Sequence, residues 1–375
     1  MHKKTRPRKH LEIANYPPPY DGWGTHTRFI VEEIRRRGHT CEVLKINENR
    51  QIKSAEYVDV QNGLDYLLKV IRFAARGYAI NVHVNAEAAK GYILALIAIV
   101  VGRLFFRKAN MTFHGGLPQS YFPAPKGSLW YWKFKFLFGI ASGVLCDSDD
   151  IKREIVKYGV APDRIGTAAG YSAQNLEYQQ AGPSAEAEAF LHSHSPVFFC
   201  YVSFRPEYQL DVLREGMRLF RKSHPRAGFI WLGFPKKEMP AAEDHISTFA
   251  EDEKASLLLL GTLSHDEFLT LLLRCTAKLR TPGCDGVSAS VLESLALGMP
   301  VVASENGRRP PGVVTYDEMD AADMCRKLEH LMQNRDAIIR QIRLEPPPDN
   351  VAMATDWLLG ESQGGSKISH SSAPG

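Results

Sequence analysis

Apolar and polar residues in the first half of the chain follow two alternating patterns. Residues 25–37, 64–74 and 149–158 place apolar side chains three or four positions apart, as on one face of a helix. Strands separated by helices of this length predict βαβ units and a parallel sheet. The intervening short apolar runs, typical of buried strands, lie at residues 11–14, 41–46, 79–84, 110–113 and 142–146.

The pattern stops after Gly170 and begins again near residue 197. Residues 174–196 are polar and rich in Ala, Ser, Gln and Glu, so we predict a linker there, with His192 and His194 in a loop. The alternation of strands and helices then returns. We expect the strands of a second αβ domain at residues 197–202, 228–232, 256–260, 277–280 and 300–303.

The length of the chain agrees with two domains, because 375 residues are too many for one ordinary hydrophobic core. The last fifteen residues, ESQGGSKISHSSAPG, have too few apolar side chains to fold. We predict a first domain at residues 1–178, a linker at 179–196, a second domain at 197–345, a C-terminal helix at 346–360 and a disordered tail at 361–375.

The composition is that of an ordinary globular protein, with 44% hydrophobic and 23% charged residues. The net charge of +4 does not suggest nucleic acid as a partner. Basic residues cluster in the first ten positions, as a frayed terminus or as a patch that contacts anionic lipid heads. No apolar core follows this run, so we predict no signal peptide.

The apolar segment at residues 91–106 is the one membrane candidate in the sequence. Arg103 interrupts it, and it is shorter than the roughly 20 residues that span a bilayer. We therefore predict a helix that is buried on all sides.

The six cysteines are scattered, without a CxxC pair or the spacing of metal ligands. This distribution is typical of reduced thiols in the cytosol, and we predict no metal site.

The most informative segment reads TPGCDGVSASVLESLALGMPVVAS, where a strand ends and a helix begins near Ser288. Helix N-termini attract phosphate, Gly286 lets a ligand approach the backbone, and Ser288 offers a cap and a hydroxyl. The carboxylates of Asp285 and Glu293 suit sugar or ribose hydroxyls rather than phosphate. A capped helix with a solvated glutamate is the alternative interpretation.

This segment resembles the donor-site motif of family 4 glycosyltransferases, which has an acid, seven residues, Glu and then Gly-x-Pro-Val-Val-Ala. Here the motif runs from Asp285 through Glu293 to residues 298–303. The resemblance extends over residues 11–331. It implies the GT-B fold, an α/β architecture in which two Rossmann-like domains, one for the acceptor and one for the nucleotide-sugar, face each other across a cleft.

The resemblance also implies roles for the residues of the motif. Glu293 would bind the ribose of a nucleotide-sugar donor. Asp285 would hold hydroxyls of the transferred sugar as a catalytic residue. The N–H groups after Gly286, together with Ser288, would face the diphosphate.

Other positions match the same family. Gly22 and Gly24, in ANYPPPYDGWG, would lie near the phosphate–sugar junction, and Gly261 near the nucleobase. His114, in MTFHGG, would be a catalytic histidine whose neutral ring accepts a hydrogen bond from a sugar hydroxyl. Arg205, in VSFRPE, would bind the diphosphate and assist catalysis.

The chain departs from the family at two catalytic positions, and at the first of these the motif begins with Asp285 rather than the usual Glu. The usual Lys-Gly after the arginine is replaced by Tyr208-Gln209, so a cation at the leaving diphosphate is missing. Arg308 or Arg309 would replace it, unless both are solvated loop residues.

The resembling enzymes work without a metal or other cofactor and retain the anomeric configuration. No Asp-x-Asp or histidine cluster in the chain argues for a bound metal, so we expect a metal-independent, same-face transfer that the leaving diphosphate assists. The acceptor would be a saccharide or a lipid-linked molecule, in the cytoplasm or at the inner face of the membrane. Residues 120–139, dense in aromatics and with three lysines, would stack on a carbohydrate acceptor, lie on an anionic membrane or form helix core.

Two other functions stay open. The missing lysine suits a nucleotide-sugar-binding protein with impaired catalysis. A sugar-nucleotide epimerase uses the same two-domain architecture. An NAD-binding enzyme is disfavoured because no GxGxxG follows the first strand.

Overall fold

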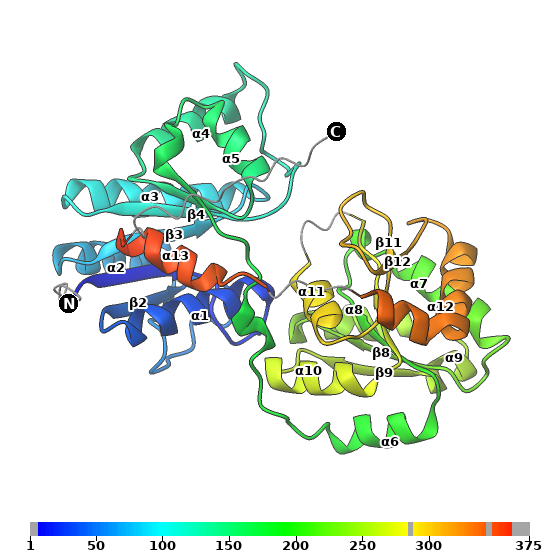
Figure 1. Cartoon of the computed structure of the whole chain (residues 1–375). Coiled ribbons are helices and arrows are strands. Elements are labelled where there is room, and N and C mark those ends of the chain that lie inside the picture. Colours follow the sequence, from blue (N-terminus) through cyan, green and yellow to red (C-terminus); the bar gives the residue numbers. More distant parts are fainter. Residues whose placement is uncertain (1–6, 284–287, 343–346, 362–375) are drawn as a thin grey trace. The chain divides into compact units, whose positions relative to one another are not determined.

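The computed structural model describes residues 7–283, 288–342 and 347–361. The chain divides into two compact units, coloured along the sequence in Figure 1. Unit 1 comprises residues 1–15, 27–169 and 349–375, and unit 2 comprises residues 16–26 and 170–348.

Unit 1 is built on a parallel sheet in which six strands are described, in the order β2-β1-β3-β4-β5-β6. The strands are β1 (Lys9–Ala14), β2 (Thr40–Lys45), β3 (Ala79–Val84), β4 (Ala109–Phe113), β5 (Val144–Cys146) and β6 (Ile165–Thr167). The helices are α1 (Gly22–Arg36), α2 (Gly63–Ala75), α3 (Ala89–Leu104), α4 (Leu129–Ile140), α5 (Asp149–Val156) and α13 (Asn350–Leu359). The step from β1 to β2 runs opposite to the steps from β2 through β3 to β6. Right-handed crossovers therefore place α1 on one face of the sheet and α2 to α5 on the other.

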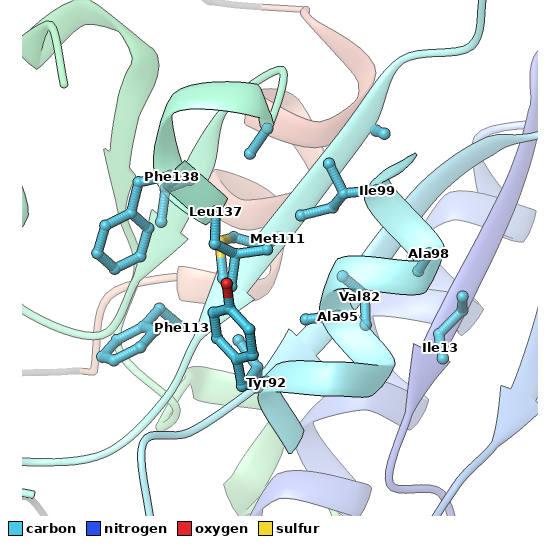
Figure 2. Packing of buried hydrophobic residues seen from close by; sticks show 14 of the residues in the cluster. Ile13, Val82, Tyr92, Ala95, Ala98, Ile99, Met111, Phe113, Leu137 and Phe138 are labelled. Carbon is cyan, nitrogen blue, oxygen red and sulfur yellow. The ribbon is translucent and has the colours of Figure 1, made fainter. Parts of the chain in front are cut away.

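The core of unit 1 lies between the sheet and helices α2 to α5 (Figure 2). Ile13 on β1, Val82 on β3 and Met111 on β4 point into it and are almost fully buried. Because side chains alternate along a strand, the residues between them point to the other face. On β1, β3 and β4 that other face carries polar residues, among them Glu12, Asn81 and Thr112.

Helices α3 and α4 each bury one face only. Tyr92, Ala95 and Ile99 of α3 are buried, whereas Ile93 and Leu104 are 54% and 70% exposed. The prediction that this apolar helix is buried on all sides is therefore wrong. Ile93 and Leu104 lie on a different side of α3 from the one that packs against α2 and α4. These two helices therefore leave both side chains exposed.

Unit 2 repeats the architecture, with six described parallel strands in the order β12-β11-β10-β7-β8-β9. They are β7 (Val197–Tyr201), β8 (Gly228–Leu232), β9 (Leu257–Gly261), β10 (Ala277–Arg280), β11 (Val301–Ser304) and β12 (Val313–Tyr316). The helices are α6 (Ala185–Ser193), α7 (Leu210–Arg221), α8 (Met239–Ser247), α9 (Glu251–Ala255), α10 (His265–Arg274), α11 (Ala289–Ala296) and α12 (Ala321–Gln341). Two parallel sheets with interleaved helices confirm the predicted pair of Rossmann-like domains.

Two parts of the predicted domain plan look different in the structure. Residues 179–196, predicted as a linker, contain α6, which buries Ala187 and Phe190 in the core of unit 2. His192 therefore lies in a helix rather than a loop. The C-terminal helix α13 belongs to unit 1, where Trp357 packs against Gly143 and Gly166. The predicted disordered tail lies, apart from Glu361, outside the described residues.

Candidate functional site

The predicted donor helix, α11, follows β10 at the carboxyl end of the unit 2 sheet. Ser288 is its N-cap residue, but the hydroxyl makes no capping bond and lies 3.3 Å from that of Ser290. The predicted position of the N-cap is therefore confirmed, but the Ser288 side chain does not cap the helix. Asp285 and Gly286 lie outside the described residues.

Glu293 is buried on α11, at 5% exposure, and both of its described contacts are made by Oε1. Nδ2 of Asn175 donates to Oε1 at 3.0 Å, and Nε2 of His265 lies 3.1 Å from the same atom. Burial and the charge of Glu293 raise the pKa of Tyr171 to about 12. Glu293 is thus a fixed, buried carboxylate and not the solvated residue of the alternative interpretation.

The predicted glycines adopt three different environments in unit 2. Gly22 is exposed at the first residue of α1, and a Cβ added there would have nothing within 4 Å. The N–H of Gly24 donates to Oδ1 of Asp21 at 2.6 Å, and a Cβ there would lie 3.3 Å from that oxygen. Gly261 ends β9 with φ +61°, a left-handed conformation that favours glycine.

Arg205 is an exposed cation at the end of the loop after β7, with a side chain that is 58% exposed. Its Nε donates to Oγ of Ser203 at 3.0 Å, and Nη1 lies 3.3 Å from Glu207. The guanidinium stands 5.5 Å from the ring centre of Tyr208. Gln209 has a left-handed conformation (φ 49°, ψ 47°) at the start of α7.

Two buried cations on β10 were missed in the reading of the sequence. Lys278 is fully buried and Arg280 is 7% exposed. Nζ of Lys278 donates to the carbonyl of Ser290 at 3.1 Å, and the guanidinium of Arg280 lies 5.2 Å from the rings of Tyr201 and Tyr208. The signal was present, since a central parallel strand that reads AKLR carries two charges where a continuous apolar run is usual.

The loop after β10 is held by several polar contacts. Oγ1 of Thr281 donates to the carbonyl of Tyr208 at 2.6 Å, and Nη2 of Arg309 donates to the carbonyl of Pro282 at 2.7 Å. Nε of Arg309 also donates to the carbonyl of Ser304 at 2.8 Å. Arg309 therefore braces this loop, whereas Arg308 is exposed.

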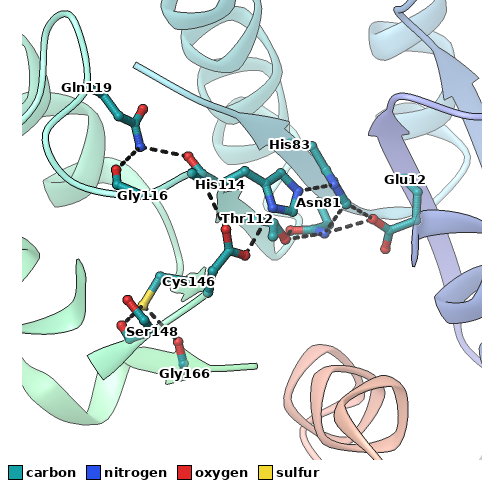
Figure 3. Close-up of polar contacts among 12 residues, drawn as sticks. Glu12, Asn81, His83, Thr112, His114, Gly116, Gln119, Cys146, Ser148 and Gly166 are labelled. Carbon is teal, nitrogen blue, oxygen red and sulfur yellow. Dashed lines mark hydrogen bonds and ion pairs between the residues drawn. The ribbon is translucent and has the colours of Figure 1, made fainter. Parts of the chain in front are cut away.

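In unit 1, His114 lies at the carboxyl end of β4 within a chain of hydrogen bonds (Figure 3). Its Nε2 lies 2.8 Å from Nδ1 of His83, and its Nδ1 lies 3.1 Å from Oδ1 of Asp147. Nε2 of His83 in turn lies 3.0 Å from Oε2 of Glu12. Both ring nitrogens of His114 thus contact protein groups, including the nitrogen expected to accept from a sugar hydroxyl.

The loop after His114 is fixed by Gln119. Its Nε2 donates to the carbonyls of His114 and Gly116 at 2.9 and 3.1 Å, as drawn in Figure 3. The N–H of Gly115 donates to Oδ2 of Asp147 at 2.8 Å. Gly115 has φ +110°, and a Cβ there would lie 2.6 Å from Nε2 of Gln119. Only glycine fits this position, so the strand end and Asp147 keep a defined geometry.

Glu12 and His83 were also missed, although the strands carried a signal. The strands KHLEIA, AINVHV and ANMTF alternate apolar and polar residues instead of forming continuous apolar runs. Such alternation means that one face of a doubly covered sheet is polar. The parallel register brings Glu12 beside Asn81 and His83 beside Thr112 on that face.

Residues 7–283, 288–342 and 347–361 contain neither a metal cluster nor a membrane-spanning helix. No group of three or more His, Cys, Asp or Glu side chains in these ranges is placed to hold a metal ion. No helix there has the length and apolar character needed to cross a bilayer.

Solved structures share this fold at low sequence identity. HepE of Anabaena, in complex with UDP-glucose, superposes with a TM-score of 0.67 at 12% identity, over 94% of this chain and 99% of that one. A glycosyltransferase from Rickettsia africae gives 0.66 at 12% identity, over 96% and 100% of the two chains. A UDP-N-acetylglucosamine 2-epimerase gives 0.63 at 13% identity, over 96% and 98%. No protein-family model matches the chain, and no curated protein matches it by sequence. At such identities the likeness establishes the fold, which is that of the GT-B proteins.

Proposed function

We propose that the protein is a retaining, metal-independent glycosyltransferase of the family 4 type, which moves a sugar from a nucleotide-sugar donor to a saccharide or lipid-linked acceptor. The observation that carries this proposal is the buried carboxylate of Glu293 on α11, the helix that follows a strand bearing two buried cations. A carboxylate held by Asn175 and His265 suits ribose hydroxyls, and the cations suit a diphosphate.

The donor would bind in unit 2. Glu293 would accept hydrogen bonds from the ribose through Oε2, since Oε1 already contacts Asn175 and His265. Arg205 and Arg280 would neutralise the diphosphate, with Arg280 in the role of the missing lysine. Their guanidinium groups lie 5.5 and 5.2 Å from the ring of Tyr208, so both lie beside the same side chain.

The chemistry follows from these charges. As the bond between the anomeric carbon and the diphosphate breaks, negative charge grows on the leaving oxygen, and the two arginines stabilise it. The acceptor hydroxyl would then attack the same face, with its proton passing to the departing phosphate. Asp285 would hold the transferred sugar. His114 would act on the reacting sugar by charge, because both of its ring nitrogens already contact the protein.

The acceptor side is proposed from helix α4. Tyr131, Phe134 and Phe138 of α4 are buried, whereas Leu129, Trp132 and Phe136 are 69%, 56% and 55% exposed. Lys133 and Lys135 flank this exposed row, with Nζ atoms 4.3 and 5.1 Å from the rings of Trp130 and Trp132. An apolar row flanked by lysines suits an anionic membrane that carries a lipid-linked acceptor.

Donor binding and turnover test the proposal. A thermal-shift panel of UDP-, GDP- and ADP-sugars should raise the melting temperature with one class, since a ligand at about a hundredfold excess over its Kd stabilises by roughly 2.7 kcal/mol. No shift of a folded sample with any of them would contradict the donor site. Release of nucleoside diphosphate, with or without an acceptor, would then establish transfer or hydrolysis.

A sugar-nucleotide epimerase is the second candidate, supported by the structural similarity to a UDP-N-acetylglucosamine 2-epimerase. Such an enzyme would convert the nucleotide-sugar without an acceptor. NMR of the donor incubated alone with the protein separates the two, because a new epimer would appear. Tight binding without any conversion would instead support a binding protein, as the Tyr208-Gln209 replacement suggests.

A further inference from the structure

The contacts among Glu12, His83, His114 and Asp147 form one line across four neighbouring strands of unit 1 (Figure 3). Each of the three contacts requires one proton between its two heavy atoms. An ionised Asp147, whose Oδ2 accepts from the N–H of Gly115, also accepts at Oδ1, so Nδ1 of His114 carries the proton of their contact. The remaining two contacts need two more protons.

Two neutral imidazole rings carry two protons in all. The three contacts need three protons, whereas two ionised carboxylates and two neutral rings supply only two. The four groups together therefore hold one additional proton. This proton has three places: the carboxyl group of Glu12, the ring of His83 and the ring of His114. It moves among them along the existing hydrogen bonds, and neither ring has to turn.

The surroundings favour sharing this proton. Glu12 is fully buried, and its Oε1 has no hydrogen-bond partner among the described residues. Burying an ionised carboxyl group in that position costs desolvation free energy, and a shared proton lowers this cost. The charged and titratable groups that act on His83 are Glu12 on β1, His114 after β4 and Asp147 after β5, and burial lowers the pKa of His83.

We propose that Glu12 and His83 are positioning residues that hold one proton in reserve for His114, which takes it up when negative charge develops during the transfer. The role in transfer rests on the proposed function. In this step the O–H bond of Glu12 breaks as Nε2–H forms on His83, and Nδ1–H of His83 breaks as Nε2–H forms on His114. The total charge of the four groups is unchanged.

Histidine NMR of the ligand-free protein tests the shared proton directly. With 15N-labelled histidine, His114 should carry its proton on Nδ1, and the signals of His83 and His114 should respond together to a single protonation step. A proton on Nε2 of neutral His114, or two rings that titrate independently, would overturn the proposal. This measurement needs no variant.

Glu12→Gln provides the matched change. The amide of glutamine can donate to Nε2 of His83, which supplies the third proton of the line without an additional one. In exchange it gives up the hydrogen bond that Oε2 of Glu12 accepts from Nδ2 of Asn81 at 2.7 Å. The joint protonation step should therefore disappear while the fold is kept. The control is Glu42→Gln, because Glu42 pairs in register with Leu11 and points to the opposite face from Glu12. A joint step that persists in Glu12→Gln contradicts the reserve.

Kinetics separate this inference from the proposed function. In Glu12→Gln the pH profile of kcat should lose one ionisation, while KM for the nucleotide-sugar changes by less than about twofold. Glu42→Gln should keep the wild-type profile, and an unchanged profile in Glu12→Gln would overturn the role in transfer. Absence of turnover by the wild-type protein would overturn the proposed function, whereas the NMR titration decides the shared proton by itself.

Discussion

Lys278 and Arg280 lie two residues apart on β10, so their side chains leave the same face of a central strand. Both are almost fully buried. Lys278 donates to the carbonyl of Ser290 in the first turn of α11, and the guanidinium of Arg280 lies 5.2 Å from the ring centres of both Tyr201 and Tyr208. Two like charges that are buried close together attract an anion strongly, so this relationship favours a negatively charged ligand there.

Replacement of Arg280 should weaken donor binding. Arg280→Gln removes a charge-assisted hydrogen bond to the diphosphate, worth about 1.5–3 kcal/mol. We therefore expect the affinity for the nucleotide-sugar that raises the melting temperature to fall about 10- to 100-fold. Isothermal titration calorimetry measures this. The control is Arg274→Gln on α10, which loses a surface pair with Glu188 at 2.9 Å. Equal affinity losses in both variants, or none in Arg280→Gln, would contradict the assignment.

Replacement of Glu293 should abolish the thermal shift. Glu293→Ala removes the carboxylate that would bind the ribose, and leaves Asn175 and His265 without their shared partner. Glu293→Gln keeps the volume and one acceptor, and should also bind less tightly. Glu186→Gln, on the exposed side of α6, is the matched control and should shift like the wild-type protein. A full shift with Glu293→Ala would exclude ribose binding by this residue.

Much of the fold could be predicted because short strands with apolar residues alternate with helices along the chain. The bounds predicted for β3, β8 and β10 agree with the structure. Helix α6 was missed because its composition resembles a linker, and only Ala187 and Phe190 anchor it in the core. Such a helix is stabilised by tertiary packing, which local composition does not contain.

The site was only partly readable for a different reason. Glu293 and His114 stand in motifs, so their places at a helix and a strand end could be expected. Glu12 and His83 are 71 residues apart, and only the register of β1, β3 and β4 brings them into one line. Pairing of distant strands fixes such contacts, and a single sequence does not state that pairing.

Removal of His114 should lower turnover strongly. His114→Ala deletes the ring that lies between His83 and Asp147, so we expect kcat to fall by about 10²-fold or more, as for other oriented catalytic groups. Release of nucleoside diphosphate under saturating donor measures it. His330→Ala, on the exposed side of α12, should stay near the wild-type rate. A loss of less than about threefold in His114→Ala would sink the catalytic role.

Substitution of the exposed row on α4 should release the protein from membranes. Trp132→Ser with Phe136→Ser removes apolar side chains that are 56% and 55% exposed, so the cost in folding free energy should be small. Flotation with vesicles of anionic lipid should fall, and wild-type binding should weaken at high salt. Leu273→Ser, at a 39% exposed position of α10 in unit 2, is the control. Wild-type protein that does not float with any vesicle contradicts the membrane contact.

The buried His10 should make stability depend on pH. Burial lowers the pKa of His10 below its usual 6.5. Near pH 6.5 His10 in the unfolded chain therefore binds a proton that His10 in the folded protein does not bind. The free energy of unfolding consequently falls as the pH drops through this range. Each pKa unit of difference corresponds to about 1.4 kcal/mol.

Urea unfolding at about pH 7.5 and about pH 5.5 measures how the free energy of unfolding depends on pH, and this dependence should be shallower in His10→Gln. His192→Gln, with a side chain that is 77% exposed on α6, should keep the wild-type slope. Equal slopes in His10→Gln and wild type would show that His10 takes up its proton alike in both states.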